Sequence, residues 1–150
     1  MGELKKTDYA ILAELTKDSR QSFRMLAKKI GTSVSTVIKR VHLLQQEGII
    51  KDFTISVDHH KLGYEYHALV EIVSRQQEHR GVVDWLQNRK EVYAVYQVTG
   101  TKDVYTLIRT KDQAELRGFL DGMQRQEGVD RTETRIIFEA PYENSGFQSL

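Results

Sequence analysis

One stretch of the sequence gathers side chains that can bind phosphates and read DNA bases. From Arg20 to Lys51 the chain carries seven basic residues and one acidic residue, although the net charge of the whole chain is only +1. Arginine can bond guanine through two hydrogen bonds, lysine neutralises phosphate, and serine and threonine hydroxyls bond either group. This pattern predicts binding to double-stranded DNA. The candidate DNA-binding residues are Arg24, Ser33, Ser35, Thr36, Lys39, Arg40 and Lys51.

A second group of polar residues lies in the C-terminal half of the chain. The exposed amides and carboxylate of the turn Gly100-Thr101-Lys102-Asp103 could hold a charged small molecule, although most hairpin turns of this kind bind nothing. Thr132 and Thr134 place two hydroxyls on one face of a predicted strand, where they either contact a ligand or simply favour strand structure. The candidate effector-binding residues are Gly100, Thr101, Lys102, Asp103, Thr132 and Thr134.

Three short helices must position the basic residues. We expect Thr7 to be the N-cap of the first helix, and Ser22 to cap a second helix that Gly31 ends. Ser33 is expected to cap a third helix, which ends at Gly48. Two short helices joined by a tight turn form a helix-turn-helix, whose second helix enters the major groove of DNA.

The third helix is expected to have an apolar face and a polar face. The polar face near its start carries the candidate DNA-binding residues, and a merely solvated face is the alternative. Residues 49–57 alternate in their second part, which predicts a strand that flanks the helices as a wing. The residues expected to point inward from the third helix are Val34, Val37, Ile38, Val41 and Leu44.

The C-terminal half follows the order strand, helix, strand, strand, helix, strand, which is typical of a ferredoxin-like βαββαβ domain. Both alternating sets of strand residues are largely apolar, yet two helices cover only one face of a sheet. We expect the other face to pack against a second subunit, with the chain's own N-terminal domain as the alternative. The predicted strands are about 66–74, 92–99, 104–110 and 131–139, and the predicted helices are about 81–89 and 113–126. The opposed sets are Ala68, Val70 and Ile72 against Leu69 and Val73, then Val92, Ala94 and Val98 against Tyr93 and Val95.

These elements predict an α+β protein in which a winged helix-turn-helix is joined to a ferredoxin-like sensor domain. The expected divisions are a DNA-binding domain at 1–50, a wing strand and linker at 51–63, an effector-binding and oligomerisation domain at 64–140, and a C-terminal tail at 141–150.

The composition argues against several other classes of protein. The chain has no Cys, which excludes disulfides and thiolate metal sites, and it has no phosphate-binding loop or His-Glu-x-x-His motif, so we expect no enzymatic activity and no cofactor. His59 and His60 are neighbours on an extended segment, so they point apart and we expect no metal. Without a long apolar run or a signal peptide, the expected location is cytoplasmic, with no membrane contact.

Several segments together resemble the Lrp/AsnC family of leucine-responsive and asparagine-responsive transcriptional regulators, over nearly the whole chain. The resemblance implies dimers, often assembled into octamers, with an amino acid or related metabolite bound between the sensor domains of neighbouring dimers. It also implies that Gly100 to Asp103 contribute to the effector pocket, although the family commonly has an acidic and an aromatic residue where this chain has Thr101 and Lys102. The matching segments are 8–12, 26–33, 40–44, 47–50 and 62–63.

The resemblance and the charges together suggest a mechanism. Loop amides would hold the carboxylate of the effector, while Asp103 or threonine hydroxyls would take its amine or polar side chain. Binding would alter assembly and therefore the spacing of the recognition helices on DNA. Our expected effector is glutamine. The alternatives are a constitutive or architectural DNA-binding protein, a module whose basic helix binds an acidic protein, and a small ferredoxin-like enzyme.

Overall fold

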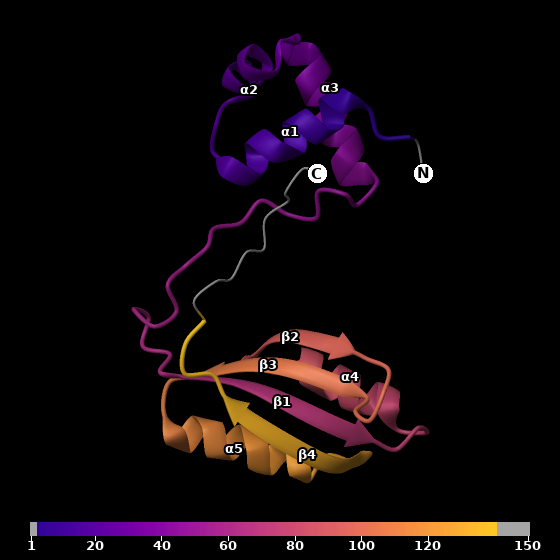
Figure 1. Cartoon of the computed structure of the whole chain (residues 1–150), viewed down its shortest axis with the longest axis vertical. Helices are drawn as coiled ribbons and strands as arrows, with labels where there is room; N and C mark the ends of the chain where they lie inside the picture. Colours follow the sequence, from indigo (N-terminus) through magenta and orange to yellow (C-terminus); the bar gives the residue numbers. More distant parts are fainter. Residues whose placement is uncertain (1–2, 141–150) are drawn as a thin grey trace. The chain divides into compact units, whose positions relative to one another are not determined.

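The N-terminal unit consists of three helices, α1 (Lys6–Lys17), α2 (Phe23–Ile30) and α3 (Val34–Gln46) (Figure 1). This computed structural model describes residues 3–140, so the expected tail at 141–150 lies outside the described residues. The chain divides into two compact units, and the boundary between them in the sequence lies between Ser56 and Val57. Within residues 3–140, no helix is long and apolar enough to cross a membrane.

Two of the three expected helix caps are confirmed. The Ser22 hydroxyl accepts a hydrogen bond from the Met25 N–H at 3.2 Å, and Gly31 ends α2 with φ +69°. The first helix, however, begins at Lys6, so the expected cap at Thr7 is wrong. The carboxylate of Asp8 accepts a hydrogen bond from the Lys5 N–H at 2.7 Å, which makes Lys5 the N-cap and starts α1 two residues earlier than a cap at Thr7 would.

The apolar face of α3 is narrower than predicted. Val37, Val41 and Leu44 are buried, but Val34 and Ile38 are 38% and 50% exposed, so their predicted inward orientation is wrong. Each residue turns the helix by about 100°, which carries Ile38 away from the buried face that Val37 defines. The core of the N-terminal unit is formed by Ile11, Leu15, Leu26, Ala27, Val37, Val41 and Leu44.

The predicted wing strand does not form. Residues 51–58 contain no strand or helix, and Phe53, Ile55 and Val57 are exposed. Apolar alternation indicates extended backbone, but a β-strand also needs hydrogen bonds to a neighbouring strand. Among residues 3–140, no strand pairs with this segment. A turn at residues 59–63 then leads into the second unit.

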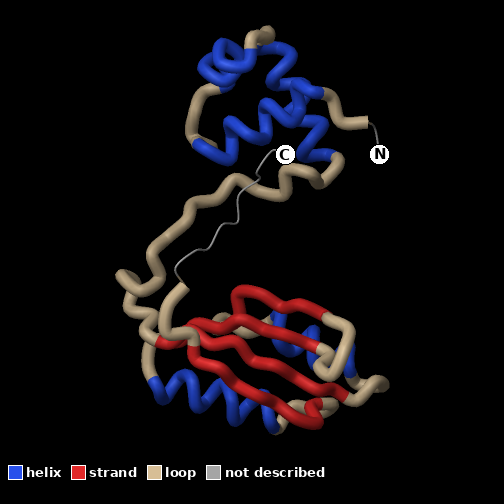
Figure 2. The backbone as a smooth tube through the Cα atoms, viewed as in Figure 1, coloured by secondary structure: helices blue, strands red, loops and turns tan. Residues whose placement is uncertain are grey.

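The C-terminal unit has the predicted βαββαβ order, and its antiparallel sheet has the strand order β2-β3-β1-β4, with the strands labelled in Figure 1 and drawn in red in Figure 2. Each predicted strand and helix is found within a few residues of its expected bounds. The elements are β1 (Tyr66–Ser74), α4 (His79–Gln87), β2 (Val92–Gln97), β3 (Val104–Thr110), α5 (Gln113–Gln124) and β4 (Val129–Ile136).

Both helices pack against the same face of this sheet. Alternate residues of β1, among them Val70 and Ile72, are fully buried beneath α4 and α5. We call the other side the open face. By the strand register it carries Leu69, Glu71 and Val73 of β1, Ala94 and Tyr96 of β2, Tyr105, Leu107 and Arg109 of β3, and Arg131, Glu133 and Arg135 of β4.

A β-bulge changes which residues of β2 face the core. The pairing with β3 shifts between Val92 and Ala94, so Tyr93 is an extra residue in the strand. Val92 and Val95 therefore pack on the helix-covered side, whereas Ala94 lies on the open face. The predicted grouping of Val92 with Ala94 is wrong for this reason, because simple alternation assumes an uninterrupted strand.

Candidate functional site

The start of α3 presents a cluster of exposed hydroxyl groups. The Ser33 Oγ lies 2.9 Å from the Ser35 Oγ and 2.8 Å from the Thr36 Oγ1, and it accepts a hydrogen bond from the Thr36 N–H at 3.1 Å. Helix N-termini attract anions because several backbone N–H groups lack partners there. The predicted hydroxyls are therefore held together at a position suited to phosphate and base edges.

Exposed basic residues precede and follow this hydroxyl cluster in the sequence. Lys39 lies one turn further along α3, Arg24 lies in the first turn of α2, and both side chains are exposed. Neither forms an ion pair with another residue in the described part of the chain, so both charges are available to phosphate. Lys51 is exposed just after the third helix, in the segment that lacks a strand.

Arg40 differs from the other predicted DNA-binding residues because it is not a free surface cation. Its Nε and NH2 groups donate to the two carboxylate oxygens of Asp8, and only 20% of the Arg40 side chain is exposed. The hydrogen bond from Arg40 and the backbone bond from Lys5 lower the pKa of Asp8, against the effect of its burial. The expectation that Arg40 lies on the exposed side of α3 is therefore wrong, and the pair instead joins α1 to α3.

The turn after β2 is fastened to the end of β1 through Asp103. The Asp103 carboxylate accepts a hydrogen bond from the Ser74 N–H at 2.7 Å, and the Asp103 N–H donates to the Ile72 carbonyl at 2.9 Å. The Val98 N–H in turn donates to the Asp103 carbonyl at 3.0 Å. These bonds fix the turn that the sequence marked as a candidate effector site.

A polar hollow of about 440 Å³ lies beside Asp103. The Nδ1 of His79 lies 2.7 Å from the Ser74 Oγ, and its Nε2 lies 3.0 Å from the Gln97 Oε1. His79 thus bridges the end of β1 and the end of β2, which the sequence did not indicate because five residues separate it from Ser74 and eighteen from Gln97. The hollow is lined by Ser74, Gln76, His79, Gln97, Val98 and Asp103.

The other predicted effector residues do not meet in this hollow. Thr132 and Thr134 pair with Ile72 and Val70, whose side chains are in the core, so the threonines lie on the helix-covered face of the sheet. Lys102 turns to the open face and forms ion pairs with the carboxylates of two glutamates there. Of the predicted set, the structure therefore lines the hollow with Asp103 alone.

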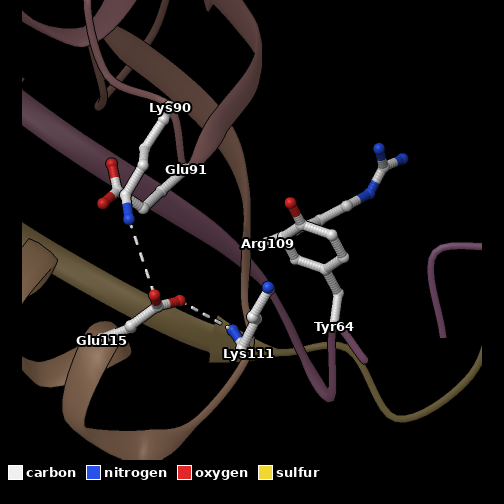
Figure 3. A pocket seen from close by; sticks show the side chains of 6 residues that line it. All are labelled: Tyr64, Lys90, Glu91, Arg109, Lys111 and Glu115. Atoms are coloured by element: carbon white, nitrogen blue, oxygen red, sulfur yellow. Dashed lines mark hydrogen bonds and ion pairs between the residues drawn. The ribbon is translucent and has the colours of Figure 1, made fainter. Parts of the chain in front are cut away.

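A second hollow lies at the opposite end of β3 and is more highly charged (Figure 3). The Glu115 carboxylate pairs with the Lys90 Nζ at 3.6 Å and accepts the Lys111 backbone N–H at 3.0 Å. Arg109, whose guanidinium lies 3.5 Å from the centre of the Tyr93 ring, bonds the Nε2 of His59 at 2.7 Å. These contacts hold residues 59–64 against the sheet. The lining residues are Tyr64, Lys90, Glu91, Arg109, Lys111 and Glu115.

No group of three or more His, Cys, Asp or Glu side chains in residues 3–140 is arranged to hold a metal ion. The ring of His59 instead bonds Arg109 and lies edge-on to Tyr64, with 5.8 Å between the ring centres.

Comparisons with known protein families assign both halves of the chain. A family profile described as winged helix-turn-helix DNA-binding matches residues 4–51. A second profile, described as the Lrp/AsnC ligand binding domain, matches residues 67–147. The two matches cover the helical unit and the sheet unit respectively.

Similar proteins match over nearly their whole length. The HTH-type transcriptional regulator FL11 of Pyrococcus furiosus is 34% identical over 144 residues, which cover 96% of this chain and 95% of that protein. Among solved structures, Bacillus subtilis LrpC has 28% identity and a TM-score of 0.85, with 95% of this chain and 100% of that chain covered. A Neisseria meningitidis regulator solved with L-Met shares the fold, with a TM-score of 0.89, 19% identity and 97% of each chain covered.

Proposed function

Since this chain belongs to the Lrp/AsnC family of helix-turn-helix transcriptional regulators, we propose that it reads specific DNA sequences with α3 and adjusts this binding to an amino acid held by its C-terminal unit. The family consists of DNA-binding regulators rather than enzymes. The observation that carries the proposal is the pairing of an exposed, hydroxyl-rich start of α3 with a separate polar hollow beside Asp103.

On DNA, the start of α3 enters the major groove. The hydroxyls of Ser35 and Thr36 contact base edges, and Lys39 contacts phosphate, because these side chains are exposed and close to the N-terminus of the helix. Arg24 and Lys51 add phosphate contacts on either side. Arg40 acts mainly by holding α3 against α1 through Asp8.

The effector is a polar amino acid, of which glutamine is our candidate. The hollow beside Asp103 is lined almost entirely by hydrogen-bonding side chains, with Val98 as its apolar member. The Asp103 carboxylate suits an ammonium group, while His79 and Gln97 can bond a carboxamide. The Neisseria regulator solved with L-Met supports the amino-acid class but not this particular side chain.

Assembly uses the open face of the sheet. Leu69, Leu107 and Tyr96 lie on that face, which α4 and α5 leave uncovered, and Tyr96 is 55% exposed. A second copy that packs its own open face there would bury these apolar groups, as in a two-layer sheet sandwich. Dimers of this kind, and octamers built from them, provide the closed assembly through which an effector can alter the spacing of the α3 helices.

A thermal-shift screen against the twenty amino acids tests the effector proposal. At about 100 times its dissociation constant, a bound amino acid stabilises the native protein by about 2.7 kcal/mol, which corresponds to a rise of several degrees in Tm. Trp85, the single tryptophan, reports on the C-terminal unit by its fluorescence. We expect a selective shift that Asp103→Ala removes and that Lys111→Ala, a change in the other charged hollow, leaves intact.

Two other results of this screen are informative. If only branched aliphatic amino acids raise the Tm, the hollow does not select polar side chains and the assignment of glutamine is wrong. A second informative result is that none of the twenty amino acids raises the Tm, while the protein still binds one duplex sequence specifically in the presence of excess bulk DNA. In that case the chain is better described as a constitutive regulator.

A further inference from the structure

Four charged side chains form a closed ring on the open face of the sheet. The Lys102 Nζ lies 3.4 Å from the Glu71 Oε2 and 3.2 Å from the Glu133 Oε2. Arg135 joins the remaining oxygens, with its Nε 3.0 Å from the Glu71 Oε1 and its NH2 2.8 Å from the Glu133 Oε1. Each carboxylate therefore divides its two oxygens between the same lysine and the same arginine.

The ring compensates an unfavourable pair within the sheet. Glu71 and Glu133 are direct cross-strand partners of β1 and β4, and like charges at such positions destabilise a sheet. The Glu71 side chain is only 8% exposed, so its charge is costly without a nearby cation. Arg135 comes from β4 itself, whereas Lys102 comes from the turn between β2 and β3.

The side chains of Lys102 and its neighbour Asp103 contact two different parts of the C-terminal unit. Asp103 bonds the Ser74 N–H beside the polar hollow, and Lys102 reaches Glu71 and Glu133 on the open face. The two residues share one peptide unit, which is planar and stiff. A displacement of Asp103 is therefore expected to move the Lys102 ammonium relative to the two carboxylates.

We propose that Lys102 is the residue that couples the effector hollow to the assembly face, through its ion pairs with Glu71 and Glu133. This inference rests on the proposed function for the location of both sites. With the ring closed, the four charges neutralise one another and the face can be desolvated against a second copy. With Lys102 displaced, Glu71 and Glu133 face each other with Arg135 as their remaining partner, which opposes burial of that face.

The coupling can be measured without knowing the effector, by a double-mutant cycle on the self-association of the full chain. Asp103→Ala perturbs the turn, and the double variant Lys102→Met/Glu133→Gln removes one cation and one carboxylate, leaving the Glu71–Arg135 pair and the net charge unchanged. Sedimentation velocity over a range of concentrations gives the dissociation constant of the assembly for all four combinations. Trp85 fluorescence shows in parallel that the C-terminal unit of each is folded.

We expect Asp103→Ala to change the dissociation constant at least about threefold in the natural chain and to have no such effect in the double variant, since contacting residues are non-additive. An equal change in both backgrounds, or no change in either, would overturn the proposal. If Asp103→Ala prevents folding, Asp103→Asn takes its place as a milder perturbation, because its neutral carbonyl oxygen accepts a weaker hydrogen bond from the Ser74 N–H than the carboxylate does.

Addition of L-glutamine at millimolar concentration separates the two claims. Binding to both the natural chain and the double variant, with altered sedimentation of the natural chain alone, is the expected result. Altered sedimentation of both overturns the coupling role of Lys102. If L-glutamine does not bind but the mutant cycle is non-additive, the coupling holds and the effector assignment fails.

Discussion

The Asp8 carboxylate of α1 and the Arg40 guanidinium of α3 are paired side by side, 32 residues apart in the sequence. Asp8 is fully buried, so Arg40→Ala would leave an unpaired charge inside the N-terminal unit. We expect this change to lower the free energy of unfolding of that unit by about 2–3 kcal/mol. Loss of helical signal in far-UV circular dichroism on heating measures the effect, and Trp85 fluorescence reports separately on the other unit.

Lys39→Ala is the matched control, since Lys39 is exposed on the same helix and has no ion pair among residues 3–140. It should change stability by less than about 0.5 kcal/mol. Equal melting curves for the Arg40 and Lys39 variants would show that the Asp8 pair does not stabilise the helices.

The same pair predicts a loss of stability in acid. The hydrogen bond from Arg40 lowers the pKa of Asp8 in the folded chain, while the pKa of an unfolded aspartate is about 3.9. The stabilisation is therefore complete above the unfolded pKa and is lost as the pH falls below it toward the folded pKa. Circular dichroism melts between pH 7 and pH 3 should show a steeper decline for the natural chain than for Asp8→Asn. Parallel declines would assign the acid sensitivity to other carboxylates.

Local signals in the sequence were sufficient to predict most of the secondary structure. Ser22 and Ser33 cap their helices because a short side chain can bond the N–H three residues later, a relationship confined to one turn. The strands of the C-terminal unit followed from alternation and from turn residues, and together with the two helices they gave the βαββαβ order of elements that the structure has.

Contacts between distant residues were not predictable in this way. The bulge at Tyr93 depends on how β2 meets β3, and no pattern within β2 indicates it. In the same way, no local pattern around Arg40 indicates that Asp8 lies beside it, and none around Lys102 indicates its ion pairs with Glu71 and Glu133. Charge pairing across elements has no sequence periodicity, so the sequence did not indicate these intramolecular partners.

Lys39 is expected to act on DNA affinity rather than on stability. If Lys39 contacts one phosphate, Lys39→Ala weakens binding to all duplexes and makes the plot of log affinity against log salt less steep by about 0.9. Fluorescence anisotropy with a labelled operator and with unrelated DNA at several salt concentrations measures both effects. Lys90→Ala, a 77% exposed lysine of the other unit, is the control. If the slope of log affinity against log salt were unchanged in Lys39→Ala, Lys39 would not be part of the DNA-binding surface.

Two glycines of the C-terminal unit should respond to alanine in opposite directions. Gly128 has φ +91°, and a Cβ there would lie 2.4 Å from the Glu78 Cβ and 3.2 Å from the Val82 Cγ2. Gly128→Ala therefore combines backbone strain with a clash against α4 and should cost about 3 kcal/mol. Gly118 lies exposed within α5, where a Cβ would meet nothing within 4 Å, so Gly118→Ala should stabilise by about 0.5–1 kcal/mol.

Urea unfolding followed by Trp85 fluorescence compares these variants, since Trp85 packs against Phe119 of α5 with 5.7 Å between ring centres. The two substitutions add the same methyl group to the same unit, so the difference in sign isolates backbone conformation and local space from hydrophobicity. A Gly128→Ala variant as stable as the natural chain would mean that the start of β4 can move away from α4. In that case the short connection before β4 is not fixed by the glycine, and its packing against Glu78 is adjustable.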